Sequence, residues 1–216
     1  MGQARHDYLP AAGRDILLPF YDPLVKLLGA DRARRKLFDQ ASVQPDHRIL
    51  DVGCGTGTFA VAVKRWLPGA NVVGLDPDPK ALARSQRKAR AAGVSIRFDQ
   101  GLANAMPYPD DSFNRVFSSF MFHHLPQEAR LTALRDVRRV LKPGGSLHLL
   151  DFVEGGRSHN PLARWLHTSQ RMQDNTQERI LSLMSEAGFR EPRLLGMDQR
   201  MFGRIAYYQA SAPGVV

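Results

Sequence analysis

Short apolar runs alternate with stretches of helical periodicity from about residue 48 onward. The runs lie at residues 49–52, 71–75, 94–98, 116–120 and 147–150. Between the last two, Leu131, Leu134, Val137 and Leu141 recur at the spacing of one helix face. Strands that alternate with helices form βαβ units, whose parallel sheet carries helices on both faces. The pattern therefore predicts an α/β, doubly wound fold.

The two ends of the chain depart from this alternation. A predicted helix ends at Gly188, and apolar runs near 193–195 and 205–208 are close enough to pair as an antiparallel hairpin at one sheet edge. Near the amino terminus, apolar stripes broken by Pro19 and Pro23 indicate two short amphipathic helices. They fit a packing layer or a lid over a site, and apolar stripes favour packing. We therefore divide the chain into an N-terminal helical segment, 1–45, and a main domain, 46–212.

Composition narrows the class of protein. The chain has 216 residues, of which 43% are hydrophobic and 24% charged, a globular balance that excludes a disordered chain, a collagen-like repeat and a coiled coil. Its one cysteine, Cys54, excludes an internal disulfide and a cysteine-built zinc site, and we expect no metal. No apolar stretch reaches the ~20 residues of a membrane helix. We expect a soluble, cytoplasmic protein.

The net charge of +9 raises the question of an anionic partner, because basic surfaces bind nucleic acids. The basic residues are scattered and mostly arginine, with local groups at 32–36, 84–90 and 135–139. Each group lies in a predicted helix, where charges usually form the solvated face. No RNA-binding signature accompanies them. Nucleic-acid binding is therefore disfavoured without being excluded.

The strongest chemical signal is a glycine-rich loop at residues 53–57 that follows one predicted strand and opens a helix. Glycines let the backbone approach a ligand, and the helix start offers free N–H groups. Thr58 replaces the last glycine of the dinucleotide fingerprint, and no phosphate-loop lysine follows. Asp76 ends the next strand, where an acidic side chain can accept hydrogen bonds from ribose hydroxyls or cap a helix. Because Asp76 follows the glycine-rich loop at this distance, ribose binding is favoured over helix capping.

Six pieces in order resemble one known family. They lie at residues 50–57, 73–76, 106–113, 123–125, 141–145 and 186–189. The chain resembles class I S-adenosylmethionine-dependent methyltransferases, of the branch that includes the ubiquinone and menaquinone C-methyltransferases. The resemblance implies a Rossmann-like methyltransferase fold, with a mostly parallel seven-stranded sheet and an antiparallel C-terminal edge hairpin. It also implies S-adenosyl-L-methionine as cofactor.

The resemblance assigns roles to particular residues. The methionine portion of the cofactor would be held by Asp51, Gly53, Gly55, Thr56 and Gly57. Asp76 would bind the ribose, Pro77 would flank the adenine, and Ser119 and Phe120 would border the reactive methyl group. Leu102 and Ala103 stand where similar enzymes place a polar residue followed by alanine. Leu102 cannot supply the side-chain hydrogen bond to adenine, which leaves the Ala103 N–H. Asn114 replaces the usual aspartate, for which we expect a local capping change.

Substrate residues should follow the carboxyl ends of the strands. The candidates are largely aromatic: Tyr8, Phe20, Tyr21, Met121, Phe122, Phe152 and Trp165, with Glu154 and His167 as polar points. The set suits a flat or greasy small molecule. Core packing is an equal alternative for Phe120 and Phe122. His123 and His124 are the candidate catalytic bases for a phenol or quinol, against helix capping and packing. The quinone enzymes carry an Arg-Asn pair at these two positions.

These observations predict a methyltransferase that acts on a C, O or N centre of a small, apolar or aromatic acceptor. Two alternatives stay open. The charge allows an RNA methyltransferase, and Leu102 allows a cofactor-binding protein of the same fold without catalysis. The sequence fixes neither the acceptor nor the oligomeric state.

Overall fold

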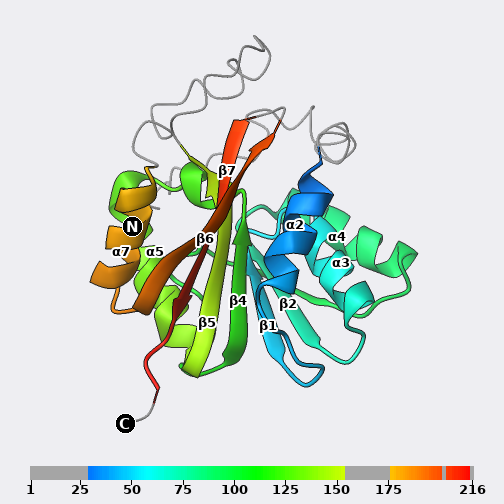
Figure 1. The fold of residues 1–216 in the computed structure, drawn as a ribbon. Helices are drawn as coiled ribbons and strands as arrows, with labels where there is room; N and C mark the ends of the chain where they lie inside the picture. The colour runs from blue at the N-terminus through cyan, green and yellow to red at the C-terminus, as the bar shows by residue number, and fades with distance from the viewer. Residues whose placement is uncertain (1–28, 154–175, 201–202, 215–216) are drawn as a thin grey trace, which may run out of the picture.

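The computed structural model describes residues 29–153, 176–200 and 203–214 (Figure 1). Over this part of the chain the strands form one seven-stranded sheet in the order β3-β2-β1-β4-β5-β7-β6. Its strands are β1 (Arg48–Val52), β2 (Asn71–Asp76), β3 (Arg97–Gln100), β4 (Phe113–Ser119), β5 (Leu141–Phe152), β6 (Arg190–Arg200) and β7 (Gly203–Ser211). β1 to β5 pair in parallel, whereas β7 pairs antiparallel with both β5 and β6. The mostly parallel sheet and its antiparallel edge hairpin are confirmed.

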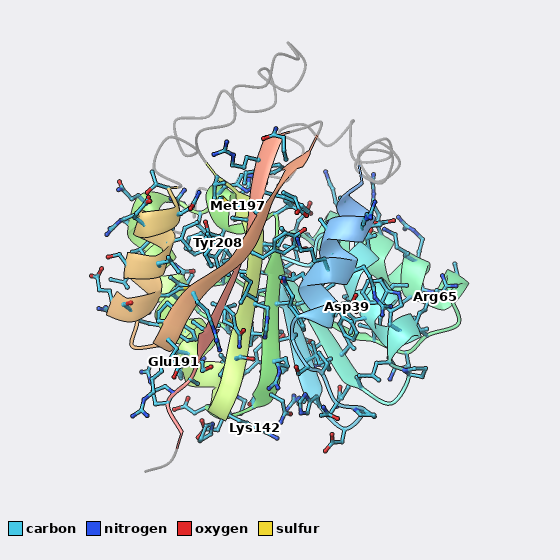
Figure 2. All side chains as sticks on the ribbon, in the orientation of Figure 1. Asp39, Arg65, Lys142, Glu191, Met197 and Tyr208 are labelled. Carbon is cyan, nitrogen blue, oxygen red and sulfur yellow. The ribbon has the colours of Figure 1, made fainter. Side chains whose placement is uncertain are left out.

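Helices cover both faces of this sheet, as Figure 1 shows. They are α2 (Ala30–Asp39), α3 (Thr58–Trp66), α4 (Pro79–Ala91), α5 (Gln127–Val140), α7 (Gln177–Glu186) and a short 3₁₀ turn, η2 (Phe122–His124). Alternate residues of β1 enter two separate cores, because successive strand side chains point to opposite faces. Ile49 packs with α2 and α3, and Leu50 packs with α5 and α7. Figure 2 shows the side chains that fill both layers.

Two predicted strands are displaced from their expected positions. The third begins at Arg97 and not at residue 94, because the Val94 N–H still bonds Ala89 O at the end of α4, next to Gly93 with φ +66°. β5 begins at Leu141, which pairs with Phe113 ahead of the predicted turn, and the register shifts before Ser146. In both cases backbone hydrogen bonding decides the boundary, which apolar periodicity does not report.

The carboxyl ends of the five parallel strands meet at one edge of the sheet. Lys142, labelled at the bottom of Figure 2, marks the start of β5, so that edge lies at the top. Asp78 caps α4 as predicted, since its side chain accepts a hydrogen bond from the Lys80 N–H at 2.8 Å. Asn114 accepts from the Arg48 N–H at 2.9 Å and so ties the starts of β4 and β1 together. This tie replaces the capping change expected there.

No helix in the described part of the chain is long and apolar enough to cross a membrane. Helix α2 packs its buried face, formed by Ala30, Ala33 and Leu37, into the core that also contains Ile49. The division of the chain at residues 45 and 46 stays a prediction.

His148 is a titratable side chain inside the sheet. It lies on β5, is 0% exposed, and its Nε2 lies 3.0 Å from the Ser146 hydroxyl. Burial lowers the pKa of His148 from 6.5 to about 3, helped by the Arg115 cation. The folded protein therefore holds this imidazole neutral, while the unfolded chain takes up a proton below about pH 6.5.

We therefore expect the free energy of unfolding to fall as the pH drops from about 6.5 towards 3. The slope from this one group approaches ~1.4 kcal/mol per pH unit within that window. Urea unfolding of the protein and of His148→Gln, measured across the window, isolates the contribution as the difference between the two curves. Parallel curves would show that His148 is not held neutral by the fold.

Candidate functional site

The glycine-rich loop leaves β1 and turns directly into α3. The N–H groups of Gly53 and Cys54 both donate to Leu75 O, at 2.8 and 3.0 Å, which holds the loop against the end of β2. Gly57 is the N-cap of α3 with φ +74°, and a Cβ at that position would lie 2.6 Å from the Ser85 Cβ. Only glycine fits there without displacing α4. The loop therefore presents backbone N–H groups at the start of a helix.

Asp76 ties the loop to the next βα unit. Its Oδ2 accepts from the Gly55 N–H at 2.8 Å, and its Oδ1 accepts from the Asp78 N–H at 3.0 Å. Burial raises the pKa of Asp76, against the effect of these two backbone donors. Each carboxylate oxygen has a second lone pair, so two further donors can be accepted. The structural tie and the expected ribose role are therefore compatible.

Asp51 lies near the end of β1, just before the loop, and its carboxylate is poorly partnered. It is 1% exposed, and within the described residues neither oxygen makes a hydrogen bond of good geometry, although the Ala60 N–H acts as a weak donor that lowers the pKa of Asp51. Burial raises the pKa of Asp51 to about 7, although the Arg34 cation opposes this shift. A buried carboxylate without donors is costly for the free protein. The arrangement fits a cationic, hydrogen-bond-donating group as ligand.

Arg34 of α2 is a site residue that sequence reasoning missed. The expectation that the basic group at 32–36 forms a solvated face is wrong for Arg34, whose side chain is 15% exposed. Its Nε lies 3.4 Å from the Ser119 hydroxyl, and its guanidinium stands over the Phe120 ring. It faces the sheet because α2 turns its buried side that way. A cation therefore lies beside the end of β4, at the same edge as Asp51.

Lys88 of α4 fixes the other end of the loop. Its Nζ donates to the hydroxyls of Thr56 and Thr58, at 3.0 and 2.6 Å. Lys88, Thr58 and Arg34 also line an open cavity of about 1040 Å³ between α2, α3 and α4. Thr56 is buried, so its hydroxyl helps to shape the loop. Lys88 lies in the basic group at 84–90, and nothing in the sequence distinguishes it from its neighbours.

The chain makes a sharp turn where β4 ends. Phe120 has φ +57°, an uncommon conformation for a large side chain, and its N–H bonds Leu150 O at 2.8 Å. The next side chain, Met121, packs against Gly53, where a Cβ would overlap it. Met121 therefore lies against the glycine loop, and Ser119 and Phe120 directly precede it in the chain, while their place beside the reactive methyl group stays a prediction.

A row of rings continues from this turn along the same edge, and we call it the aromatic row. It comprises Phe120, Phe152, His123 and His124, with successive centroids 5.1, 5.2 and 4.0 Å apart. Phe122 is not part of the row. It is 2% exposed and belongs to one core cluster, with the Arg130 guanidinium over its ring. Phe120 is 8% exposed and belongs to the other core cluster, so core packing describes both residues.

His123 contacts a buried carboxylate that sequence reasoning missed. Asp151, at the end of β5, is 0% exposed, and its Oδ1 lies 2.5 Å from Nδ1 of His123. The sequence does show an aspartate directly after the apolar run at residues 147–150. It does not show that this side chain contacts His123, which lies 28 residues earlier in the chain. Only the pairing of β4 with β5 brings the two together.

The residues expected to contact adenine, Pro77, Leu102 and Ala103, have no polar side chains. Pro77 O accepts from Gln100 Nε2 at 3.1 Å, which joins the ends of β2 and β3. Leu102 pairs with Ala105 in an isolated bridge, and Ala103 packs against the core. Five candidates lie outside the described residues, together with Glu154: Tyr8, Phe20, Tyr21, Trp165 and His167. Within the described ranges, no cluster of three or more potential metal ligands occurs.

Comparison with known proteins shows what this chain resembles in sequence and in fold. Residues 49–145 match the family described as "Methyltransferase domain". Two relatives named demethylmenaquinone methyltransferase, from Thermus thermophilus and Deinococcus radiodurans, are 43% and 40% identical over 139 residues, or 63% of this chain. The chain spans 62% and 57% of the length of these two relatives.

Solved structures share the fold at low sequence identity. The [4+2]-cyclase SpnF has a TM-score of 0.71 at 21% identity, over 86% of this chain and 81% of that chain. A SAM-dependent methyltransferase from Aquifex aeolicus has a TM-score of 0.67 at 19% identity, over 83% of this chain and 89% of that chain. Residues 49–145 thus match the methyltransferase-domain family, and the described part of the chain shares its fold with a solved SAM-dependent methyltransferase.

Proposed function

We propose that the protein is an S-adenosylmethionine-dependent methyltransferase that acts on a small, apolar or aromatic acceptor. The observation that carries this proposal is the buried carboxylate of Asp51, for which the described residues provide no hydrogen bond of good geometry. The amino group of a methionine moiety is a cation with several N–H donors, which is what Asp51 lacks. Arg34, at the same edge, supplies the opposite charge for a carboxylate.

The remaining residues fit the rest of this cofactor. The loop N–H groups and the start of α3 suit the polar methionine end, and the second lone pairs of Asp76 suit the ribose hydroxyls. Leu102 offers adenine an apolar contact only. When bound, the cofactor supplies a methyl carbon on a positively charged sulfur, and the C–S bond breaks with its electron pair left on sulfur as the acceptor's pair forms the new bond.

The residues of the chain would position the reactants and exclude water, which can supply much of the rate of such a transfer. Phe120 and Met121 border the loop, and the aromatic row extends from there to His123 and His124. Flat ring faces favour a flat, apolar acceptor. The two relatives named demethylmenaquinone methyltransferase support a quinone-related acceptor. We include His123 and His124 as bases for its hydroxyl.

The proposal predicts binding of S-adenosylhomocysteine and transfer of labelled methyl. Purified protein should bind S-adenosylhomocysteine in calorimetry, and Asp76→Ala should weaken binding because it removes the ribose acceptor and frees the Gly55 N–H. Incubated with methyl-labelled cofactor and a host-cell extract, the protein should label the organic-extractable layer. Label in RNA would favour the nucleic-acid alternative, and binding without transfer to any fraction would favour a cofactor-binding protein. Absence of binding would contradict the proposal.

Binding should also depend on pH through Asp51. Because burial raises the pKa of Asp51 to about 7, this carboxyl is increasingly protonated below that pH and must lose its proton to pair with an ammonium group. We expect the affinity for S-adenosylhomocysteine to fall towards tenfold per pH unit between about pH 7 and 6, with proton release on binding. Calorimetry in buffers of different ionisation enthalpy measures both. Asp51→Asn should bind weakly with no such pH dependence, and an equal slope in that variant would exclude Asp51 as its source.

Arg34 gives an independent test of the carboxylate end. Removing a charge-assisted hydrogen bond costs roughly 1.5–3 kcal/mol, so Arg34→Ala should weaken S-adenosylhomocysteine binding by about ten- to a hundredfold. The same change removes the cation that lowers the pKa of Asp51, so the pH midpoint of binding should rise. The matched control is Arg32→Ala on the exposed side of α2, which should bind like the unmodified protein. Equal losses in both variants would indicate a general charge effect.

A further inference from the structure

We propose that Asp151 is the positioning residue of His123, holding its imidazole in the tautomer that can accept a proton from a phenol- or quinol-type hydroxyl of the acceptor. This inference rests on the proposed methyl transfer for its chemistry. Its structural content, a fixed tautomer, can be tested without any transfer.

Asp151 is buried and surrounded by donors. Its Oδ2 accepts from the His123 backbone N–H at 2.9 Å, and its Oδ1 accepts from the Phe152 backbone N–H at 2.7 Å. The third contact is with Nδ1 of His123, 2.5 Å from Oδ1. Both backbone groups can only donate, so both carboxyl oxygens act as acceptors. This fully buried side chain therefore has backbone donors on both oxygens, the arrangement that suits an acceptor-only carboxylate.

The ionised carboxylate determines which ring nitrogen carries the proton. A carboxylate cannot donate, so the short contact requires a hydrogen on Nδ1. In the neutral imidazole the other nitrogen, Nε2, then carries the lone pair. Among residues 29–153, 176–200 and 203–214, no group hydrogen-bonds this Nε2. The His123 backbone N–H also bonds the same carboxylate, so one side chain holds both the ring and the backbone of His123.

The pair lies where an acceptor would meet the cofactor. The aromatic row links His123 through Phe152 to Phe120, beside the loop and Arg34. Asp151 reaches His123 from the end of β5, the strand next to β4. Asp151 is fully buried and contacts His123, so it can act through His123 without contacting the acceptor itself.

In the transfer step, the proton on the acceptor's hydroxyl would pass to Nε2 of His123. The imidazole then carries two N–H bonds and a positive charge, which the carboxylate of Asp151 balances across the existing Nδ1 contact. The acceptor's electron pair is left to form the bond to the methyl carbon. With a quinol, removal of this proton also makes the ring carbon beside the hydroxyl more nucleophilic. After transfer to that carbon, the hydrogen it carried leaves as a proton to water, the aromatic ring is restored, and the ring oxygen takes back a proton from Nε2 of His123.

The first measurement is the tautomer in the unmodified protein. Long-range ¹H–¹⁵N correlation spectra of protein labelled with ¹⁵N-histidine separate the two neutral tautomers, and His123→Gln identifies the His123 signals by their loss. We expect the neutral ring of His123 to carry its hydrogen on Nδ1. A hydrogen on Nε2 would overturn the proposal, whatever the protein binds.

The second measurement uses Asp151→Asn. In this variant an NH2 group replaces one carboxyl oxygen and must face an N–H group that the carboxylate accepted before. The side chain can then no longer hold the His123 ring with its hydrogen on Nδ1, and the fixed tautomer should be lost. Transfer of labelled methyl to reduced demethylmenaquinone or to the organic extract should fall by about tenfold or more in this variant, and by about a hundredfold in His123→Gln. Binding of S-adenosylhomocysteine should be unchanged in both variants.

The matched control is Asp136→Asn on α5. Asp136 also accepts a backbone hydrogen bond, from Met106, but it lies away from the aromatic row. This variant should keep both the His123 tautomer and the transfer.

Transfer by Asp151→Asn at the unmodified rate would overturn the proposal. If the unmodified protein neither binds S-adenosylhomocysteine nor transfers methyl, the proposed function fails, while the tautomer spectrum still decides whether Asp151 positions His123. That spectrum needs no variant of Asp151, so it remains decisive if Asp151→Asn does not fold.

Discussion

The carboxylate of Asp76 joins two pieces of the site that come from different βα units. One oxygen holds the Gly55 N–H of the loop after β1, and the other holds the Asp78 N–H at the start of α4. With the two loop N–H groups on Leu75 O, the whole turn from β1 to α3 is anchored to the end of β2. The turn must hold this shape for its N–H groups to face a ligand. The positions of Asp51 and of the N-terminus of α3 therefore follow from the last two residues of β2.

Three strands of the sheet carry a buried aspartate as their last residue or the one before it, and the three carboxylates differ in their hydrogen-bond partners. Within the described residues, Asp151 has two backbone donors and the contact with His123 Nδ1, Asp76 has two backbone donors, and Asp51 has no hydrogen bond of good geometry. Burial without donors favours the neutral acid, which explains why the pKa of Asp51 rises to about 7. A fully paired carboxylate can position its neighbours in the free protein. A buried carboxylate without good hydrogen bonds gains them only when a ligand brings donors. Binding then offsets the free-energy cost of having removed the carboxylate from water.

The fold was predictable because its signals are local. Apolar runs, the Asp78 cap and the glycine loop report structure within a few residues, and the antiparallel hairpin follows from two neighbouring runs. The site was predictable only where it lies within that local pattern, as at Asp51 and Asp76. Arg34 and Asp151 were missed because their partners lie 85 and 28 residues away, across the sheet. Periodicity separates buried from exposed positions, but it does not show which cation on a charged helix turns inward.

Phe120 connects the charged end of the site to the aromatic end. The Arg34 guanidinium stands over the Phe120 ring, and the centroid of the Phe152 ring lies 5.1 Å from that of Phe120. Its positive φ is unfavourable for a large residue, and it persists because the N–H bonds Leu150 O while the ring is buried between neighbours. This turn directs the chain from β4 back over β5, which brings His123 to Asp151. A straight continuation of β4 would separate the two, so a single strained residue helps to keep Arg34 and His123 at the same edge of the sheet.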